Sequence, residues 1–513
     1  MYKKLTIISI FLLSVASLFA NGAKENKANI ENGSTEKVLH LAGGNVGTLN
    51  PFQHMNRGPG IFRTFLVFDS LLEKDESGLI PWLASSYSIA DDGKTYTFNL
   101  QEDAYWQDGE KLSANDVKFT IEYYKEHPPV YNQLMVNGEF IVDSVKVIDE
   151  NTIQIKTKKA GVAYLEHLGY FTIIPEHIWK DVEDPRSYDG DDKCIGSGPF
   201  IVESFNPTEG TYRLVANDKF WGLKPAVDAI EWIAVSDATL SFNNGEIDLT
   251  VISPDLVSRY ENNDEFTIIK QPALHCYRLM MNQETREEFK DVNLRKAIAY
   301  AIDVEDLIQK INRGAAFVSS QGYIPNNSSY YNDDVIKYPY NKEKALELLN
   351  GKEYSFTLLT DNSAASTKLC ELIKLKLEDV NIHVTIKAID QVSRDNNIVT
   401  GNYEMVVVFY GGMGGDPDYL RNVYSSTSNY IKGWNNKEID TLLEKQAIEF
   451  DAEKRNEQLD KIQLLISQEV PMYLMQGAYW TFVYRDGVYD NWTNRYDHNY
   501  LSHIKLSYLE RNK

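Results

Sequence analysis

Cysteine is scarce in this chain of 513 residues: only Cys194, Cys276 and Cys370 are present, and no two of them form a C-x-x-C pair. Zinc sites and dithiol redox sites need clustered ligands of that kind, so the sequence gives no basis for either. Two interpretations of the thiols stay open. One disulfide could form among them and leave one thiol free, or all three are small buried hydrophobic residues, which the sequence favours.

Motifs of the common secreted hydrolases are also missing. The chain has no G-x-S-x-G or H-E-x-x-H segment, and its nine histidines show no metal-ligand spacing. Glu and His are adjacent in "YLEHL" and "PEHIW", but adjacent residues on a helix do not face one another. Asp416 and Asp418 could form the carboxylate pair of a glycosidase, yet no acid/base partner marks them. We therefore expect a binding protein that needs no cofactor, with a hydrolase as the alternative class.

Positive charge is in short supply. The chain has 52 Lys and Arg against 74 Asp and Glu, a formal net charge of −22. Such a balance disfavours nucleic-acid backbones and anionic membrane surfaces as partners. It carries no information about the fold.

The chain has one long apolar run, Leu5–Phe19, which follows two lysines and ends before the small residue Ala20. This layout predicts a secretory signal peptide over residues 1–20. The apolar run is too short for a membrane-spanning helix, because spanning a bilayer needs about 20 apolar residues. A retained anchor helix is the alternative. Residues 21–36 are polar and predict a disordered tether. The segment "SLFAN" resembles a lipoprotein box with Asn21 in place of the acylated Cys, so we expect a soluble extracytoplasmic protein, membrane-tethered only if Asn21 replaces a native Cys.

Local patterns in the first half predict alternating strands and helices. Residues 94–100 alternate apolar and polar side chains after the turn signal "DDG". A helix is predicted over 113–126, with Ser113 as its N-cap and Asp116 as the acid of a capping box. The segment "VDSVKVIDENTIQIKTK" predicts two strands joined at "DEN".

The second half predicts a sheet buried on both faces. Residues 293–311 have helical spacing, with Asp303 interrupting the helix and capping its second part. A compact helix is predicted over 341–351, between Asn341 and Gly351. A strand, a helix and two further strands are predicted next, and the last of these strands is the apolar segment "YEMVVVF". This order is typical of an α/β fold with a parallel or mixed sheet.

Four glycines lie within five positions directly after that last strand, in "MVVVFYGGMGGDPDYL" (405–420). The loop has no lysine and carries two aspartates, so it does not suit a phosphate group. It leaves the carboxyl end of a buried strand, where open α/β sheets place their ligand crevice. A plain surface turn is the alternative, but four glycines favour a close approach of the backbone to a ligand. The candidate ligand-binding residues here are Tyr410, Gly411, Gly412, Met413, Gly414 and Asp416.

Several segments in order resemble family 5 of the extracellular solute-binding proteins of ABC transporters, the class that binds peptides and nickel. The resemblance covers nearly the whole chain after the signal peptide. It rests on "VGTLNPF", "LIPWLASSYSIADDGKTYTFNLQEDAYWQDGEKLSANDVKFTIEYY", "GSGPFIVESF", "NNGEIDLT", "MNQETREEFKDVNLRKAIAYAID", "GGDPDYL" and "WNNKEIDTLLEKQ".

The resemblance implies a two-lobe periplasmic-binding-protein-like α/β fold that closes around one solute. Carried onto this sequence, it implies a discontinuous lobe I (37–275 plus 484–513) and a lobe II (276–483), joined by hinge crossovers near "QPALHCYRLM" and "QGAYWTFVYR". The final "YLSHIKLSYL" is expected to return to lobe I as a strand. The implied function is the extracytoplasmic substrate-binding component of an ABC importer, a monomer that delivers its ligand to permease subunits.

The resemblance leaves the substrate open. In peptide-binding members a carboxylate two places before the "GDP" element pairs with the peptide's ammonium group, and Met413 stands there in this chain. A peptide remains the expected ligand, an oligosaccharide is a serious competitor, and nickel or a metallophore is the least favoured. Further cleft candidates, each also compatible with core packing, are Trp434, Tyr277, Trp480 and Asn45.

Overall fold

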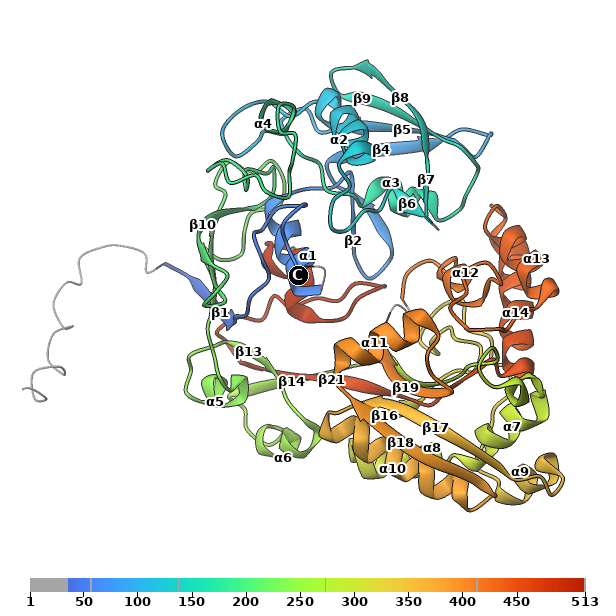
Figure 1. The fold of residues 1–513 in the computed structure, drawn as a ribbon. Coiled ribbons are helices and arrows are strands. Elements are labelled where there is room, and N and C mark those ends of the chain that lie inside the picture. The colour runs from blue at the N-terminus through green and yellow to red at the C-terminus, as the bar shows by residue number, and fades with distance from the viewer. Residues whose placement is uncertain (1–35, 56–57, 137, 273, 412–413, 512–513) are drawn as a thin grey trace, which may run out of the picture. The chain divides into compact units, whose positions relative to one another are not determined.

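The computed structural model describes residues 36–55, 58–136, 138–272, 274–411 and 414–511, and Figure 1 shows their arrangement. Val38–Lys513 forms one compact unit, distinct from Met1–Lys37. The predicted signal peptide and nearly all of the predicted tether lie outside the described residues. Within the described part of the chain, no helix has both the length and the apolar character that a membrane crossing requires.

Two four-stranded sheets are built from the first half of the chain. In one, the strand order is β1 (Val38–Ala42), β12 (Ala229–Ile233), β11 (Thr211–Ala216) and β10 (Phe200–Asn206), with only β1 and β12 parallel. The other is an antiparallel sheet in the order β4 (Ala84–Ile89), β5 (Thr95–Leu100), β9 (Thr152–Thr157) and β8 (Val142–Asp149). The strands predicted around "DDG" and "DEN" are thereby confirmed.

Helix α2 (Ala114–Glu126) shows why the local signals were sufficient there. The Ser113 side chain accepts a hydrogen bond from the backbone of Asn115, and the Asp116 carboxylate accepts one from the backbone of Ser113 at 2.9 Å. This is the predicted capping box, which satisfies N–H groups that a helix start leaves without partners. Val117, Ile121 and other side chains of the helix are buried.

A five-stranded mixed sheet forms the centre of the second half, in the order β18 (Ile382–Ile389), β17 (Tyr354–Asp361), β19 (Met405–Tyr410), β15 (Cys276–Met281) and β20 (Met472–Leu474). β17 is parallel to both β18 and β19, while β15 is antiparallel to β19 and β20. The helices around it are α7 (Val292–Ala301), α8 (Val304–Asn312), α9 (Lys342–Leu349), α10 (Ala364–Glu378) and α11 (Gln391–Thr400). The predicted break at Asp303 and the predicted cap at Asn341 are both confirmed.

A third arrangement of strands connects the two halves. The long strand β21 (Gln476–Arg485) pairs with β13 (Leu249–Val251), with β14 (Phe266–Pro272) and, at its start, with β16 (Ala316–Val318). In Figure 1 the red β21 runs beside the green β14 below the first-half strands and above the orange second-half sheet. The chain therefore passes between the halves twice, at neighbouring strands.

The remaining strands and helices complete the two halves. They are β2 (Leu72–Lys74), β3 (Leu79–Pro81), β6 (Met135–Val136), β7 (Glu139–Phe140), α1 (Gly58–Val67), α3 (Tyr164–Gly169), α4 (Glu176–Trp179), α5 (Ala238–Asn243), α6 (Val257–Tyr260), α12 (Tyr419–Tyr424), α13 (Lys437–Gln446) and α14 (Ala452–Glu469).

The hydrophobic cores follow the same division. The largest core combines side chains between Leu39 and Leu249 with side chains from Phe482 to Leu509. Two further cores are built from side chains between Leu274 and Met475. The end of the chain therefore packs with the first half.

The predicted final strand over residues 500–509 is wrong. This segment forms two short 3₁₀ turns, η3 (Leu501–His503) and η4 (Lys505–Tyr508). Its alternating pattern failed as a signal because both faces of the segment are buried, including Lys505 and Ser507. In the described part of the chain an isolated bridge joins it to Pro225, and its other backbone groups bond within the turns, as Ser507 N does to the Ile504 carbonyl at 3.0 Å, or to the Asn491 side chain, which donates to the Ser507 and Leu509 carbonyls.

Candidate functional site

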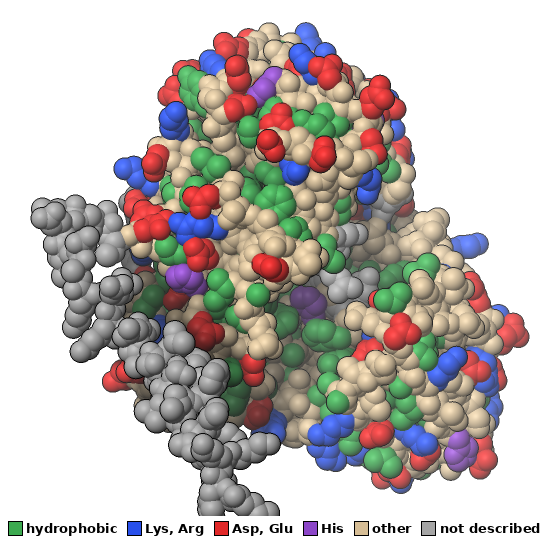
Figure 2. Space-filling view, turned by 60° about the vertical axis from the view of Figure 1, so that its left-hand side comes forward, with side chains coloured by type: hydrophobic (Ala, Val, Ile, Leu, Met, Phe, Trp, Pro, Cys, Tyr) green, Lys and Arg blue, Asp and Glu red, His purple; other side chains and the backbone are tan. Residues whose placement is uncertain are grey.

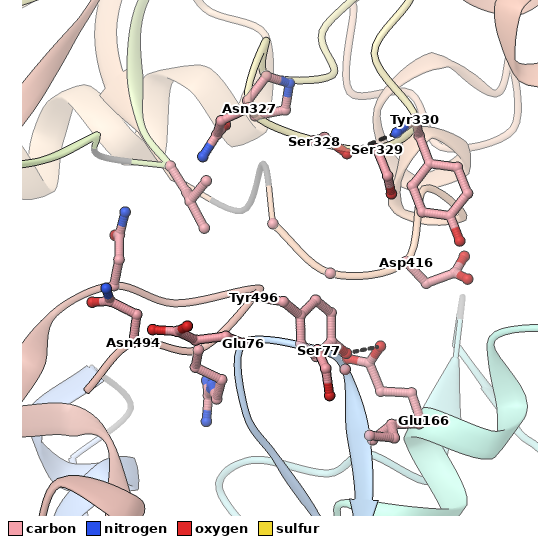
Figure 3. A pocket seen from close by; sticks show the side chains of 18 of the residues that line it. Glu76, Ser77, Glu166, Asn327, Ser328, Ser329, Tyr330, Asp416, Asn494 and Tyr496 are labelled. Carbon is pink, nitrogen blue, oxygen red and sulfur yellow. Dashed lines mark hydrogen bonds between the residues drawn. The ribbon is translucent and has the colours of Figure 1, made fainter. Parts of the chain in front are cut away.

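A cavity of about 790 Å³ lies between two walls that come from different cores. One wall consists of the β2–β3 turn, the start of α3 and residues 494–499; the other consists of residues 325–330 and 414–416. Figure 3 shows these walls facing one another, with Glu76, Ser77, Glu166, Asn494 and Tyr496 on one side and Asn327, Tyr330 and Asp416 on the other.

The surface around the cavity is charged but mixed. On the face drawn in Figure 2, acidic and basic side chains are scattered over the convex parts. Hydrophobic side chains gather where that face is hollowed between its upper and lower parts.

The glycine loop after β19 forms part of the second wall. A side chain at Gly414 would begin 2.5 Å from the Asp497 carbonyl oxygen, so only glycine allows the two backbones to lie this close. Gly415 has φ +83°, a conformation that favours glycine. Gly411 lies beside the ring of His275, where a side chain would begin 2.6 Å from the imidazole. The predicted residues Gly412 and Met413 lie outside the described residues.

Asp416 is held by a buried arginine. Arg455 donates to both carboxylate oxygens of Asp416, at 2.8 and 2.5 Å, and its side chain is only 4% exposed. The same guanidinium also donates to the Gln446 carbonyl at 3.2 Å. Asp416 accepts a further bond from the backbone of Asp418, which precedes α12. This geometry fixes Asp416 at the edge of the cavity and neutralises its charge.

On the opposite wall, charges alternate along a short network. Lys74 donates to Glu166 at 2.5 Å and to Asp497 at 2.7 Å. Asp497 lies 2.6 Å from the Nε of Arg495, and the Tyr496 hydroxyl donates to Glu166 at 2.9 Å. The lysine and the arginine are both buried, so each needs the carboxylates beside it.

The pKa values of this network follow from that pairing. Burial alone would lower the pKa of Lys74, but the Asp497 and Glu166 carboxylates outweigh burial and raise it. Burial would raise the pKa of Asp497, but Arg495 and Lys74 hold it well below its ordinary value. Lys74 and Asp497 therefore stay charged at neutral pH.

Two histidines are packed behind this network. The rings of His498 and His503 stack against Phe62, with centroids at 4.4 and 4.7 Å, and a 3.0 Å hydrogen bond joins His498 Nε2 to His503 Nδ1. Burial, reinforced by the nearby Arg495, lowers the pKa of His498 to about 3 against the opposing effect of Asp497. Burial also lowers the pKa of His503 well below its ordinary value of 6.5.

We expect this pair to make the protein less stable in mild acid. Because the pKa of His498 is lower in the folded than in the unfolded chain, the unfolded chain binds more protons below about pH 6.5, and stability falls until about pH 3. Thermal melts between pH 7 and 4.5 should show a falling Tm, and a His498→Gln variant should show a smaller slope. Equal slopes for the two proteins would contradict this assignment.

The structure brings only part of the predicted site to the cavity. Gly414 and Asp416 line it, while Gly411 lies just outside, its carbonyl accepting a bond from Arg278 at 3.1 Å. Tyr410 contributes backbone pairing to Cys276.

The other candidates lie away from the described lining. Trp434 is 7% exposed and packs edge-to-face on Tyr424 in a core. Tyr277 packs on Phe409, with centroids 4.7 Å apart. Trp480 packs on Tyr500 at the border of the largest core. Asn45 is exposed, and its side chain accepts a bond from the backbone of Gly47.

Sequence reasoning missed most of the lining. Glu166 lies in "YLEHL", where only its pairing with the adjacent histidine was considered and not its position in the first turn of α3. Tyr496 and Asn494 come from the chain end, where a strand was predicted. The loop with Asn327 and Tyr330 has a polar, proline-containing sequence that indicates only a loop.

The cysteines and possible metal ligands add nothing to this site. All three thiols are free, and Cys276 and Cys370 are buried, which fits the interpretation as small hydrophobic residues. Over the described ranges, no group of three His, Cys, Asp or Glu side chains is placed to hold a metal ion.

Comparison with known proteins gives consistent matches. A model of the bacterial extracellular solute-binding proteins, family 5 Middle, matches residues 78–432. The chain is 25% identical over 439 residues to the dipeptide-binding protein of Escherichia coli (strain K12), covering 77% of this chain and 80% of that protein. The ABC transporter substrate-binding protein CtaP from Listeria monocytogenes aligns with a TM-score of 0.78 at 25% identity, covering 89% of this chain and 94% of the other. NikA from Brucella suis in complex with Fe(III)-EDTA has the same fold, with a TM-score of 0.80 at 23% identity over 93% of this chain and all of that one (100%).

Proposed function

Because this chain belongs to the bacterial extracellular solute-binding proteins of family 5, we propose that it captures a peptide in the cavity and presents it to the permease of an ABC importer. The family's members are non-enzymatic, extracytoplasmic components of such importers, which confirms the expected binding role and the two-lobe α/β fold. The peptide is the proposal; the family also includes proteins named for nickel and heme binding.

The cavity lining is the observation that carries the peptide proposal. Its volume of about 790 Å³ falls in the range typical of small-molecule sites, about 300–1,000 Å³. Amide and hydroxyl side chains on both walls can donate to and accept from the backbone of an extended peptide. These residues are Ser77, Gln271, Asn327, Ser328, Ser329, Asn494 and Asn499.

Closure around the ligand is part of the proposal. We assign lobe I to residues 37–275 and 484–513 and lobe II to 276–483, in line with the separate cores and the two passages at β14 and β21. Both walls contact the ligand only when the lobes are closed, so the ligand stabilises the closed form by its higher affinity for it. The working form is proposed to be a monomer.

The ligand-contacting residues are proposed as Gly414 and Asp416 together with the lining side chains named above. Tyr410, Gly411, Gly412, Met413, Trp434, Tyr277, Trp480 and Asn45 stay candidates from the sequence. Export by cleavage after Ala20 also remains a proposal, with a membrane-tethered form if Asn21 replaces a native Cys.

An oligosaccharide is the second candidate, favoured by one observation. Three tyrosine rings line the cavity, Tyr87, Tyr330 and Tyr496, and aromatic faces beside amide groups also suit sugar rings.

Native mass spectrometry of freshly purified protein tests the proposal. We expect co-purified peptides, and we expect added peptides to raise the Tm, because ligand that binds only the folded chain stabilises it by about 2.7 kcal/mol at 100 times Kd. Malto-oligosaccharides serve as the comparison. A hexose ladder, or a Tm raised only by sugars, would contradict the peptide proposal and favour the second candidate.

A further inference from the structure

The ionisable side chains of the cavity lining are mostly acidic. Within the described ranges they are three carboxylates, Glu76, Glu166 and Asp416, and one cation, Arg495. The charge that each of these side chains presents to a ligand depends on the groups with which it is already paired.

Two of these four ionisable side chains are already paired with a group of opposite charge. Asp416 gives both of its oxygens to the buried Arg455. Arg495 lies against Asp497, donates to the Tyr170 hydroxyl at 2.5 Å and is only 6% exposed. Neither group offers an unbalanced charge to a ligand, and in particular Arg495 is not presented as a partner for a ligand carboxylate.

Glu166 differs because it shares its cationic partner with another carboxylate and, within the described ranges, keeps acceptor sites that no hydrogen bond uses. Among the residues that the structure describes, its one cationic partner is Lys74, which is also bound to Asp497. A carboxylate has about four acceptor sites, and Glu166 uses one for Lys74 and one for Tyr496. Its side chain is 20% exposed and points into the cavity (Figure 3). Lys74 and Tyr496 hold the carboxylate in one position, which reduces the entropy that binding would cost.

Glu166 also faces the glycine loop across the cavity. A side chain at Gly415 would begin 3.7 Å from Glu166 Oε1, an ordinary contact distance, so the carboxylate and the loop backbone are separated by the width of about one small group. Glu76, at the tip of the β2–β3 turn, has no hydrogen bond or ion pair in the described part of the chain and adds negative charge to the same space. Lys74 and Arg495 balance Glu166 and Asp497, and Arg455 balances Asp416, so Glu76 leaves the lining with a net negative charge, which favours a positive group on the ligand.

We propose that Glu166 is the specificity-determining residue of the cavity and that it binds an ammonium or guanidinium group of the ligand opposite Gly414 and Gly415. For a peptide this group would be the free amino terminus or a basic side chain, so the inference refines the proposed function. Its chemistry requires only a cation, so it can be tested separately from the peptide.

The experiment compares four probes by calorimetry: trialanine, N-acetyl-trialanine, spermidine and maltotriose. We expect the wild-type protein to bind trialanine about tenfold or more tightly than its acetylated form, since a sheltered ion pair contributes at least about 1.4 kcal/mol. Glu166→Gln should bring that ratio close to one. Glu166→Asp, which keeps the charge, should restore part of it, and Tyr496→Phe should reduce it less than Glu166→Gln does.

The control is Glu122→Gln, which removes the same charge from an exposed position on α2 and should leave the ratio unchanged. If Glu166→Gln fails to fold, Glu166→Asp and Tyr496→Phe carry the test. Equal loss of affinity for all probes would show a structural role and overturn the proposal, as would equal wild-type affinity for both peptides, or no binding of any cationic probe. Binding of spermidine but not of peptides, lost in Glu166→Gln, would overturn the peptide proposal and support Glu166.

Discussion

A Lys505→Met variant is expected to lose about 3–5 kcal/mol of unfolding free energy, the cost typical of removing one partner from a buried ion pair. Lys505 is 2% exposed and donates to Asp69 at 2.9 Å, with Glu73 at 3.3 Å. Both carboxylates are buried as well, so the variant leaves two negative charges without a cation in the largest core.

Urea unfolding followed by circular dichroism would measure this loss. Lys454→Met is the matched control, because Lys454 is exposed on α14 and its pair with Asp451 spans only one helical turn; its unfolding midpoint should stay close to that of the wild type. A midpoint like that of the control would show that the Lys505 pairing adds little to stability.

The second large effect is expected at the base of the glycine loop. Arg455→Met leaves the Asp416 carboxylate without its bidentate partner, and we expect a loss of about 3 kcal/mol, at the lower end of the range for buried pairs because Asp416 is 18% exposed. Ligand affinity should fall too, since Arg455 positions a residue that lines the cavity.

A double-mutant cycle that combines Arg455→Met with Asp416→Asn measures the free energy of interaction between these two side chains. If the ion pair is the cause, the two single losses should not add, and the coupling should be about 0.5–3 kcal/mol. Additive losses would show that each side chain acts independently of the other, Arg455 through its bonds to Gln446.

Local signals explain why parts of the fold were predictable. The capping box at Ser113, the break at Asp303 and the cap at Asn341 depend on residues within a few positions of each helix start. Their hydrogen bonds join atoms of the same short segment and need no partner from elsewhere in the chain. The parallel pairing of β17 with its neighbours followed in the same way from the order of strands and helices.

The site was less predictable because tertiary packing decides which side chains reach it. Trp434 and Trp480 lie near the loop or a crossover in the sequence, yet one is buried in a core and the other packs on Tyr500. Glu166 lies 249 positions before Gly415, that is 415 − 166, and no local pattern connects them. The resemblance supplied the architecture, and the loop sequence located one wall of the cavity.

The return of the chain end to the first core has a consequence for biosynthesis. A ribosome makes residues 39–251 long before residues 482–509, yet both belong to one core. Until the last segment has been translated, Asp69 and Glu73 lack the lysine that balances them. A prematurely terminated chain therefore lacks part of this core and the cation that balances two buried carboxylates, and we expect it to be an early target for proteases.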